Sequence, residues 1–358
     1  MFSAATYVPS IAVRPSEMEG LRRLPDADKD RILPSIRIGK WNGSHHLART
    51  FEGLEKAFGS RNIIADLAPP PVVLKTHADQ ELVDLNQSTN GHAAWTSLIR
   101  QHGNFVPTLQ WGPSDSDNIQ QAGSLLSLGR GLVIRLRRAN QWDLQRLQTI
   151  STLPLRQSPI MLVLDFGQIT QRLDNNGVVA DLMGIAVAAL RIVGGSNVTI
   201  TTAMSSFPAE FASIDRAHAR LPIRERAVFT QLAAGASLLG GVPIIYGDYA
   251  SVCVNKSSFA QGGAPRVDLA SRNEWVYYRR ETDRCYIEAS KSVMSDAAWQ
   301  AGLALWGTNE IRRAAGGDLT HLHYQRPWVG VRINVHLHQQ LHYASTDGGE
   351  NTDEAWED

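Results

Sequence analysis

Residues 161–166 read MLVLDF, a run of four apolar residues that ends on an aspartate and a phenylalanine. A strand with one face against the core would alternate apolar and polar residues, so this run predicts a strand buried on both faces. The stretch VPIIY at 242–246 has the same character. Such strands belong to parallel sheets covered by helices, and the sequence therefore indicates an α/β fold.

Similar apolar, β-branched runs recur along the first 250 residues, and each except the last precedes a polar or helical stretch. They span 7–13, 32–38, 62–67, 105–110, 132–137, 161–166, 198–202 and 242–246. Helices are predicted over 16–24, 44–58, 177–195 and 224–241. A doubly wound open sheet would show the same alternation with fewer strands, so the pattern favours a (β/α)8 TIM-like barrel over residues 1–250. We expect irregular loops over 68–91.

The pattern changes after residue 250. EWVYYRRE at 274–281 and RCYIEAS at 284–290 predict a pair of strands, and 296–315 predicts a helix. We therefore expect residues 251–343 to form a C-terminal extension that is integrated with the barrel and packed on its mouth. The acidic segment 344–358 is nearly devoid of packing side chains and predicts a disordered tail.

Composition restricts the class of partner. The 358 residues include 35 basic and 35 acidic side chains, so the net charge is zero, which argues against a nucleic-acid partner. We find no signal-peptide pattern and no apolar run of the ~18 residues that a membrane span needs, and we expect a cytoplasmic protein. We expect Cys253 and Cys285 to be buried free thiols, as is usual in a reducing cytosol. A disulfide between them stays an open alternative.

Charged residues follow several predicted strands, where a barrel of this class forms its pocket. LVIRLRRAN at 132–140 places Arg135 and Arg137 on one face of a strand. Buried guanidiniums need carboxylate partners or an anionic ligand, and Asp165 ends the next strand. Two interpretations stay open, a structural ion pair and a bidentate clamp for a phosphate or carboxylate.

The candidate catalytic residues are Asp165 and Asp248 as acid–base groups, with Ser206 and His336. Ser206 lacks a GxSxG elbow, so its pattern favours a turn over a nucleophile. The motif His-x-His occurs at 321–323 and 336–338, and on a strand it would place both rings on one face. No cysteine or close set of carboxylates accompanies these histidines, so no metal site is predicted.

The candidate substrate-binding residues are arginines, tyrosines and one asparagine that follow strands or lie in the extension. They are Arg37, Arg135, Arg137, Tyr246, Tyr249, Arg266, Tyr278, Arg332 and Asn334. Those in the extension could instead anchor it to the barrel, because tyrosine and tryptophan are common anchors. No phosphate-binding or dinucleotide-binding glycine motif is found, so no cofactor is predicted.

The order of several short motifs resembles the "beta protein" family of bacteria, phages and prophages. The motifs are YVPSIAVRPSEMEGLRRLPDADKDRILPSIRIG (7–39), LVLDFG (162–167), SSFP (205–208), IYGDY (245–249), APRVDLASRNEWVYYRR (264–280) and the W…GVRIN-H ending (328–336). The resemblance implies a barrel-like fold and a gene in mobile or defence-associated surroundings. It does not imply a particular reaction. It names as candidate positions Asp165, Ser206, Tyr246, Asp248, Arg266 and Asn334. Arg37 stands where the family pattern implies an acid.

Two hypotheses follow. In the first, the chain is an enzyme that acts on an anionic or phosphorylated small molecule held by the arginines. In the second, it is a non-catalytic protein- or peptide-binding component of a phage–host defence or counter-defence system. The sequence leaves open whether the chain is catalytic.

Overall fold

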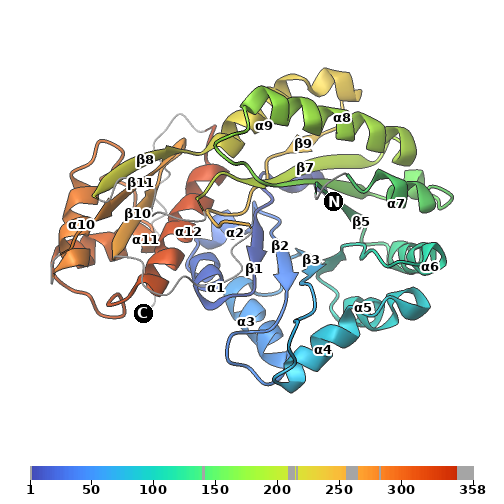
Figure 1. The fold of residues 1–358 in the computed structure, drawn as a ribbon, viewed down its shortest axis with the longest axis horizontal. Coiled ribbons are helices and arrows are strands. Elements are labelled where there is room, and N and C mark those ends of the chain that lie inside the picture. The colour runs from blue at the N-terminus through green and yellow to red at the C-terminus, as the bar shows by residue number, and fades with distance from the viewer. Residues whose placement is uncertain are drawn as a thin grey trace.

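The computed structural model describes residues 2–138, 142–208, 214, 217–254, 265–281 and 284–344. Eight parallel strands, all at positions expected from the sequence, form two four-stranded sheets (Figure 1). The first contains β1 (Ser10–Ala12), β2 (Ser35–Ile38), β3 (Ile63–Leu67) and β4 (Phe105–Pro107) in that order. The second contains β5 (Leu132–Arg137), β6 (Ile160–Gln168), β7 (Val198–Ser205) and β9 (Ile244–Ile245). The α/β class with parallel strands is therefore confirmed.

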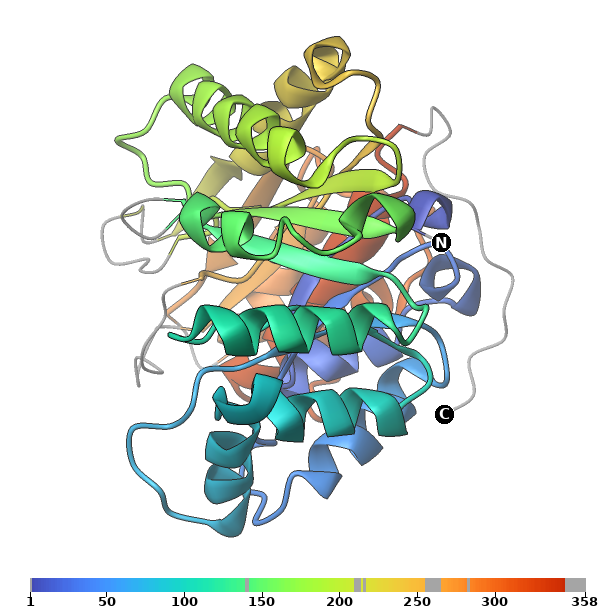
Figure 2. The ribbon, with the colours of Figure 1, turned by 90° about the vertical axis from the view of Figure 1, so that its right-hand side faces the viewer.

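Helices follow these strands and lie outside the sheets (Figures 1 and 2). They are α1 (Pro15–Arg22), α2 (Asp26–Lys29), α3 (Ala48–Phe58), α4 (His77–Leu85), α5 (Thr89–Gln101), α6 (Asp115–Leu126), α7 (Leu144–Thr149), α8 (Asn175–Val193) and α9 (Arg224–Ala234). Three short 3₁₀ turns accompany them, η1 (Phe2–Ala4), η2 (Leu155–Gln157) and η3 (Ala236–Leu239). Our expectation of irregular loops over 68–91 was wrong, because this stretch contains α4. That helix begins with a capping box between Thr76 and Asp79.

The two sheets approach each other at both pairs of edges. Beyond β4, Leu109 N donates to Val133 O at 2.9 Å, and Val8 N ahead of β1 donates to Tyr246 O at 2.9 Å. Isolated parallel bridges occur at the same two places. The expected closed barrel of eight strands is therefore not shown. The eight strands form two separate four-stranded sheets, and isolated bridges link the edges of these sheets.

Two apolar clusters lie on opposite faces of the strand layer. The larger one packs the helices against the strands. The smaller one takes alternate residues from every strand or the residues next to it: Val8, Leu33, Ile64, Val106, Val133, Met161, Val163, Ala203 and Ile245. The strands are thus buried on both faces, as the apolar runs predicted.

The C-terminal extension forms a separate layer, drawn at the left of Figure 1. Its antiparallel sheet has the order β10 (Arg266–Ala270), β11 (Glu274–Arg279) and β8 (His218–Pro222), so an earlier chain segment also contributes to it. Its helices are α10 (Cys285–Met294), α11 (Trp306–Ala315) and α12 (Gln325–Leu341). The predicted strand at 284–290 was wrong, because the buried positions of α10 continue with helical spacing to Val293, beyond that window. The predicted tail falls almost entirely at 345–358, outside the described residues.

Helix α8 is long and apolar enough to cross a membrane by length and composition, contrary to our expectation that no such stretch exists. In the structure its buried residues, Leu182, Ile185 and Ala189 among them, belong to the main apolar cluster. The helix therefore packs as part of the protein core. Both cysteines are free, Cys253 buried and Cys285 partly exposed.

The first and last long helices, α1 and α12, pack closely against each other. Asn334 Nδ2 donates to Gly20 O at 3.1 Å, and Asn334 Oδ1 accepts from Gly307 N at 3.0 Å. A Cβ at Gly20 would lie 2.8 Å from Gly330 O, which is closer than real Cβ atoms approach a backbone oxygen. The close approach of the two helices therefore requires glycine at position 20.

We expect Gly20→Ala to lower the free energy of unfolding by about 1–3 kcal/mol, because the added methyl group overpacks the α1–α12 contact. Urea unfolding of both proteins measures the change. The matched control is Gly184→Ala on α8, where a Cβ meets nothing within 4 Å. That control is expected to be neutral or to stabilise by about 0.5–1 kcal/mol. Equal unfolding midpoints for the two variants would contradict the packing argument.

Candidate functional site

Arg135 is the centre of a buried polar cluster at the carboxyl ends of the strands. Its Nε donates to Asp165 Oδ2 at 2.9 Å and one terminal nitrogen donates to Asp66 Oδ2 at 2.7 Å. The other terminal nitrogen donates to Tyr249 Oη at 2.8 Å, and that hydroxyl donates to Asp165 Oδ1 at 2.6 Å. β3, β5, β6 and the segment after β9 each supply one of these side chains. Strand alternation places Arg135 inward, where its charge is neutralised from both sides.

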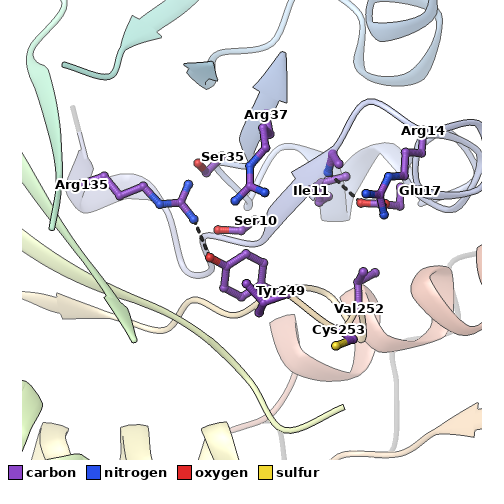
Figure 3. A pocket seen from close by; sticks show the side chains of 12 residues that line it. Ser10, Ile11, Arg14, Glu17, Ser35, Arg37, Arg135, Tyr249, Val252 and Cys253 are labelled. Carbon is purple, nitrogen blue, oxygen red and sulfur yellow. Dashed lines mark hydrogen bonds and ion pairs between the residues drawn. The ribbon is translucent and has the colours of Figure 1, made fainter. Parts of the chain in front are cut away.

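Two further guanidiniums lie beside this cluster with few protein partners. Arg137 is half exposed, and its nearest carboxylate oxygens, on Asp66 and Asp165, are 3.5 and 3.9 Å away. Among the described residues, the Arg37 guanidinium has no hydrogen-bond or ion-pair partner. Figure 3 shows it directed toward the space in front of Ser10 and the Tyr249 ring, with no dashed line reaching it. Unlike Arg135, these two cations are available to a ligand.

A small cleft of about 30 Å³ opens beside Arg37. Its walls come from β1, β2, β5, the start of α1 and the segment after β9, and include Ser10, Ser35, Arg37, Arg135, Tyr249 and Cys253. Arg14 stands at its other side and pairs with Glu17, which also accepts a hydrogen bond from Ala12 N at 2.7 Å. Hydroxyls and guanidiniums therefore border the cleft together with the Glu17 carboxylate and apolar side chains such as Ile11 and Val252.

The electrostatics of the cluster favour an anion. Burial alone would raise the pKa of Asp66, but Arg135, followed by Arg137 and Arg37, outweighs burial and lowers it. Burial raises the pKa of Tyr249 to about 12, so its hydroxyl keeps its proton. Three guanidiniums and two carboxylates leave one net positive charge, which an anionic group in the cleft would neutralise.

Asp248 belongs to a different cluster, on the helix-facing side of the strand layer. It is fully buried, and its carboxylate accepts from Tyr7 Oη at 2.5 Å, from Tyr246 Oη at 2.8 Å and from Ala250 N at 2.8 Å. His336 Nε2 on α12 lies 2.7 Å from its second oxygen. Burial alone would raise the pKa of Asp248, but His336 and these hydrogen bonds lower it. This arrangement ties α12 to the strand layer.

The structure therefore separates residues that we expected in one pocket. Tyr246, Asp248 and His336 lie together, but their partners do not include Arg135 or Asp165 in the part of the chain described. Arg226 stacks on the Tyr246 ring with its guanidinium carbon 3.5 Å from the ring centre. The catalytic role of Asp248 and His336 stays a prediction, and their burial favours a structural one.

Ser206 contacts a buried carboxyl group instead of a histidine. Its Oγ donates to Glu225 Oε2 and its backbone N donates to the same oxygen at 3.0 Å. Ser206 Oγ also accepts from Arg224 N at 3.0 Å, at the start of α9. These contacts hold the turn after β7, as the sequence pattern favoured. Burial, and then the charge of Asp248, raise the pKa of Glu225 to about 8.

The remaining predicted residues lie in the extension. Arg266 and Arg332 both pair with the buried Asp268, at 2.6 and 2.5 Å. Tyr278 Oη donates to Asp296 Oδ2 at 2.8 Å, and Asn334 connects α12 to α1 and α11. Their substrate-binding roles stay predictions, since the structure gives each a protein partner.

The structure also corrects the reading of the His-x-His motif. Residues 336–338 are helical, so His336 and His338 point in different directions, toward Asp248 and Asp28. His338 and His342, four residues apart, share a face and both contact Asp28, at 2.6 and 2.8 Å. Asp66 follows a predicted strand as Asp165 does, and this signal placed it at a strand end, but it was not among the predicted site residues.

We expect Asp248→Asn to destabilise the protein by about 3–5 kcal/mol, because the change removes the charge that His336 and two tyrosine hydroxyls face in a fully buried setting. Urea unfolding at pH 7 measures it. The control is Glu52→Gln, which breaks an exposed pair with Arg49 and is expected to cost under about 1 kcal/mol. A loss as small as that of the control would contradict the role of Asp248 as a tie for α12.

We expect the deprotonation of Glu225 to lower the free energy of unfolding as the pH rises from about 5 to 8. Its folded pKa is above its unfolded value, so the folded state holds a proton that the unfolded state releases, and stability is fully present only below the unfolded pKa. Glu225→Gln should remove this part of the pH dependence and raise stability at pH 8 by on the order of 2–4 kcal/mol. Unfolding free energies at pH 5, 6.5 and 8 test it, and parallel pH profiles for the two proteins would contradict it.

Comparison with known proteins gives the family. The chain is 25% identical over 355 residues to "Protein beta" of Enterobacteria phage P4, an alignment that covers 95% of this chain and 94% of that protein. No solved structure matches. The model of the Beta protein family matches residues 7–342, nearly the whole described chain, and the protein therefore belongs to the Beta protein family.

Proposed function

We propose that this protein binds an anionic small molecule, such as a phosphorylated compound, at the strand-end cluster around Arg135, and acts on it enzymatically. The observation that carries the proposal is the Arg37 guanidinium, which has no protein partner among the described residues and borders the cleft. A guanidinium in a partly buried position costs desolvation free energy, which an anionic ligand would offset with charge-assisted hydrogen bonds. The net positive charge of the cluster acts in the same direction.

The proposal includes the arrangement of the strands. We infer that the two sheets form one closed (β/α)8 barrel, with residues 251–343 as an integrated extension. The inference is supported by the parallel bridges Thr108–Val133 and Tyr7–Tyr246 and by the apolar cluster that draws on all eight strands. In such barrels the carboxyl ends of the strands carry the binding site, which is where Arg37, Asp66 and Asp165 lie.

The roles of the residues follow from their exposure. Arg37 would bind the anionic group in the cleft, Arg137 would add positive charge beside the cluster, and Arg135 would hold Asp66, Asp165 and Tyr249 in place. A cleft of about 30 Å³ admits a phosphate or carboxylate group, so the rest of the ligand would lie outside it, toward Arg14. Asp165 is the acid–base candidate, since it belongs to this cluster and Asp248 does not. We propose a cytoplasmic location, where phosphorylated metabolites are abundant.

A second candidate is a non-catalytic protein-binding role in phage–host conflict, consistent with the phage relative. Its specific support is the loop between β3 and α4, where Val72, Val73 and Leu74 follow three prolines and are 100%, 61% and 51% exposed. Three consecutive exposed apolar side chains are uncommon away from a contact surface.

We expect Arg37→Ala to weaken binding of a phosphorylated ligand by about tenfold or more, because one charged hydrogen bond is lost. A thermal-shift screen of inorganic phosphate, nucleoside monophosphates, sugar phosphates and dicarboxylates identifies the ligand, and calorimetry measures its affinity. Arg49→Ala is the control, because Arg49 is exposed on α3 and, among the residues that the structure describes, its ion-pair partner is the exposed Glu52. Arg135→Ala is unsuitable, since it would leave two buried carboxylates unpaired.

The outcomes separate the two candidates. A ligand that binds both wild type and Arg37→Ala equally would overturn the assignment of the anion site. If no ligand shifts the melting temperature, and a phage or host protein binds wild type and Arg37→Ala but not Leu74→Ser, the second candidate replaces the first.

A further inference from the structure

Three exposed or partly exposed side chains with metal-ligating atoms meet beside the β2–α3 loop. His46 lies in that loop, and His77 and Glu81 lie on α4. One ligand atom from each lies within 4.8 Å of the others, and His77 Nε2 is 3.9 Å from Glu81 Oε1. The His46 and His77 rings meet edge to face with centroids 5.1 Å apart. None of these residues takes part in the anion site proposed above.

Backbone hydrogen bonds hold the loop against α4 on both sides of His46. Ala78 N donates to His45 O at 2.7 Å, and Leu47 N donates to Glu81 Oε2 at 2.8 Å. The second bond uses one carboxylate oxygen and leaves Oε1 facing His77. Second-layer hydrogen bonds of this kind orient the carboxylate ligands of metal sites.

The helix that carries the other two residues is also fixed at its start. Thr76 caps α4 through Asp79, and Lys40 Nζ contacts both oxygens of Asp79 at 3.0 Å. His77 and Glu81 are four residues apart on this helix and therefore lie on one face. The three candidate ligands are thus presented by two segments whose backbones are already joined.

Distances distinguish this group from the buried group of Asp28, His338 and His342. Donor atoms that each lie about 2.0–2.2 Å from a tetrahedral zinc ion are about 3.3–3.5 Å apart. In the buried group the donors are 2.6 and 2.8 Å apart, which are hydrogen-bond distances with no room for an ion. In the exposed group the 3.9 Å separation leaves that room, and small rotations of two exposed side chains would close it.

We propose that His46, His77 and Glu81 bind a divalent transition-metal ion of the zinc class, with water completing the coordination. Two imidazoles and one carboxylate are a ligand set that zinc accepts in proteins. The bound ion would clamp the β2–α3 loop to α4, close to the strand end that carries Arg37. The ion thereby stabilises the rim of the strand-end cluster.

The test is a titration of untagged, EDTA-dialysed full-length protein with ZnCl₂ by calorimetry at pH 7.5, with CoCl₂ absorption spectra as a second readout. We expect one Zn²⁺ per chain with Kd below about 10 µM, a zinc-dependent rise in melting temperature, and Co²⁺ visible bands. His46→Ala and His77→Ala should each weaken binding by at least about tenfold.

Three controls are matched to the argument. His45→Ala removes the neighbouring imidazole but keeps the backbone bond to Ala78, His342→Gln alters the buried group, and Arg37→Ala alters the anion site, and all three should bind zinc like wild type. Absence of saturable binding by the wild type, wild-type affinity in His46→Ala and His77→Ala, or loss of binding in His342→Gln would each overturn the proposal. Because Arg37→Ala is included, failure of the metal site and failure of the anion site are distinguishable.

Discussion

A buried guanidinium between two carboxylates is the interaction on which the centre of this structure depends. Arg135 lies in the second sheet, yet Asp66, one of its partners, lies in the first, so the ion pair joins the two sheets through the interior. The two carboxylates offset the cost of burying the guanidinium, and removal of either partner would leave buried charge poorly compensated. The Tyr249 hydroxyl completes the arrangement and connects it to the segment after β9.

The three arginines of this region differ in how far protein groups satisfy their guanidiniums. Arg135 is saturated by protein groups and forms the base of the site, whereas Arg37 and Arg137 extend past it with unused hydrogen-bonding capacity. Arg137 makes only long ion pairs, at 3.5 and 3.9 Å, and Arg37 has no ion-pair partner among the described residues. The excess of cationic groups at one end of the strands is the feature that supports the proposed binding of an anionic ligand.

The strand positions were predictable because buried parallel strands are short apolar runs between helices, and MLVLDF is one of them. Which of the candidate side chains lie together could be predicted only in part. Tyr246 and Asp248 share a face and Tyr249 has the other, but a strand that is apolar on both sides does not reveal which face is interior. The helical period of α12 was missed because His336 and His338 also fit a strand. The strand interpretation placed both rings on one face, whereas the helix directs them toward different partners, Asp248 and Asp28.

The packing of α1 on α12 has a consequence for how the chain folds. The partners of Gly20 are more than 300 positions away in the sequence, so a ribosome must add more than 300 residues after Gly20 before that contact can form. Until then the side of α1 that packs on α12 lacks its cover, and the nascent chain exposes surface that invites aggregation or chaperone binding. Chains released early by a premature stop codon would keep that surface exposed and become substrates for proteases.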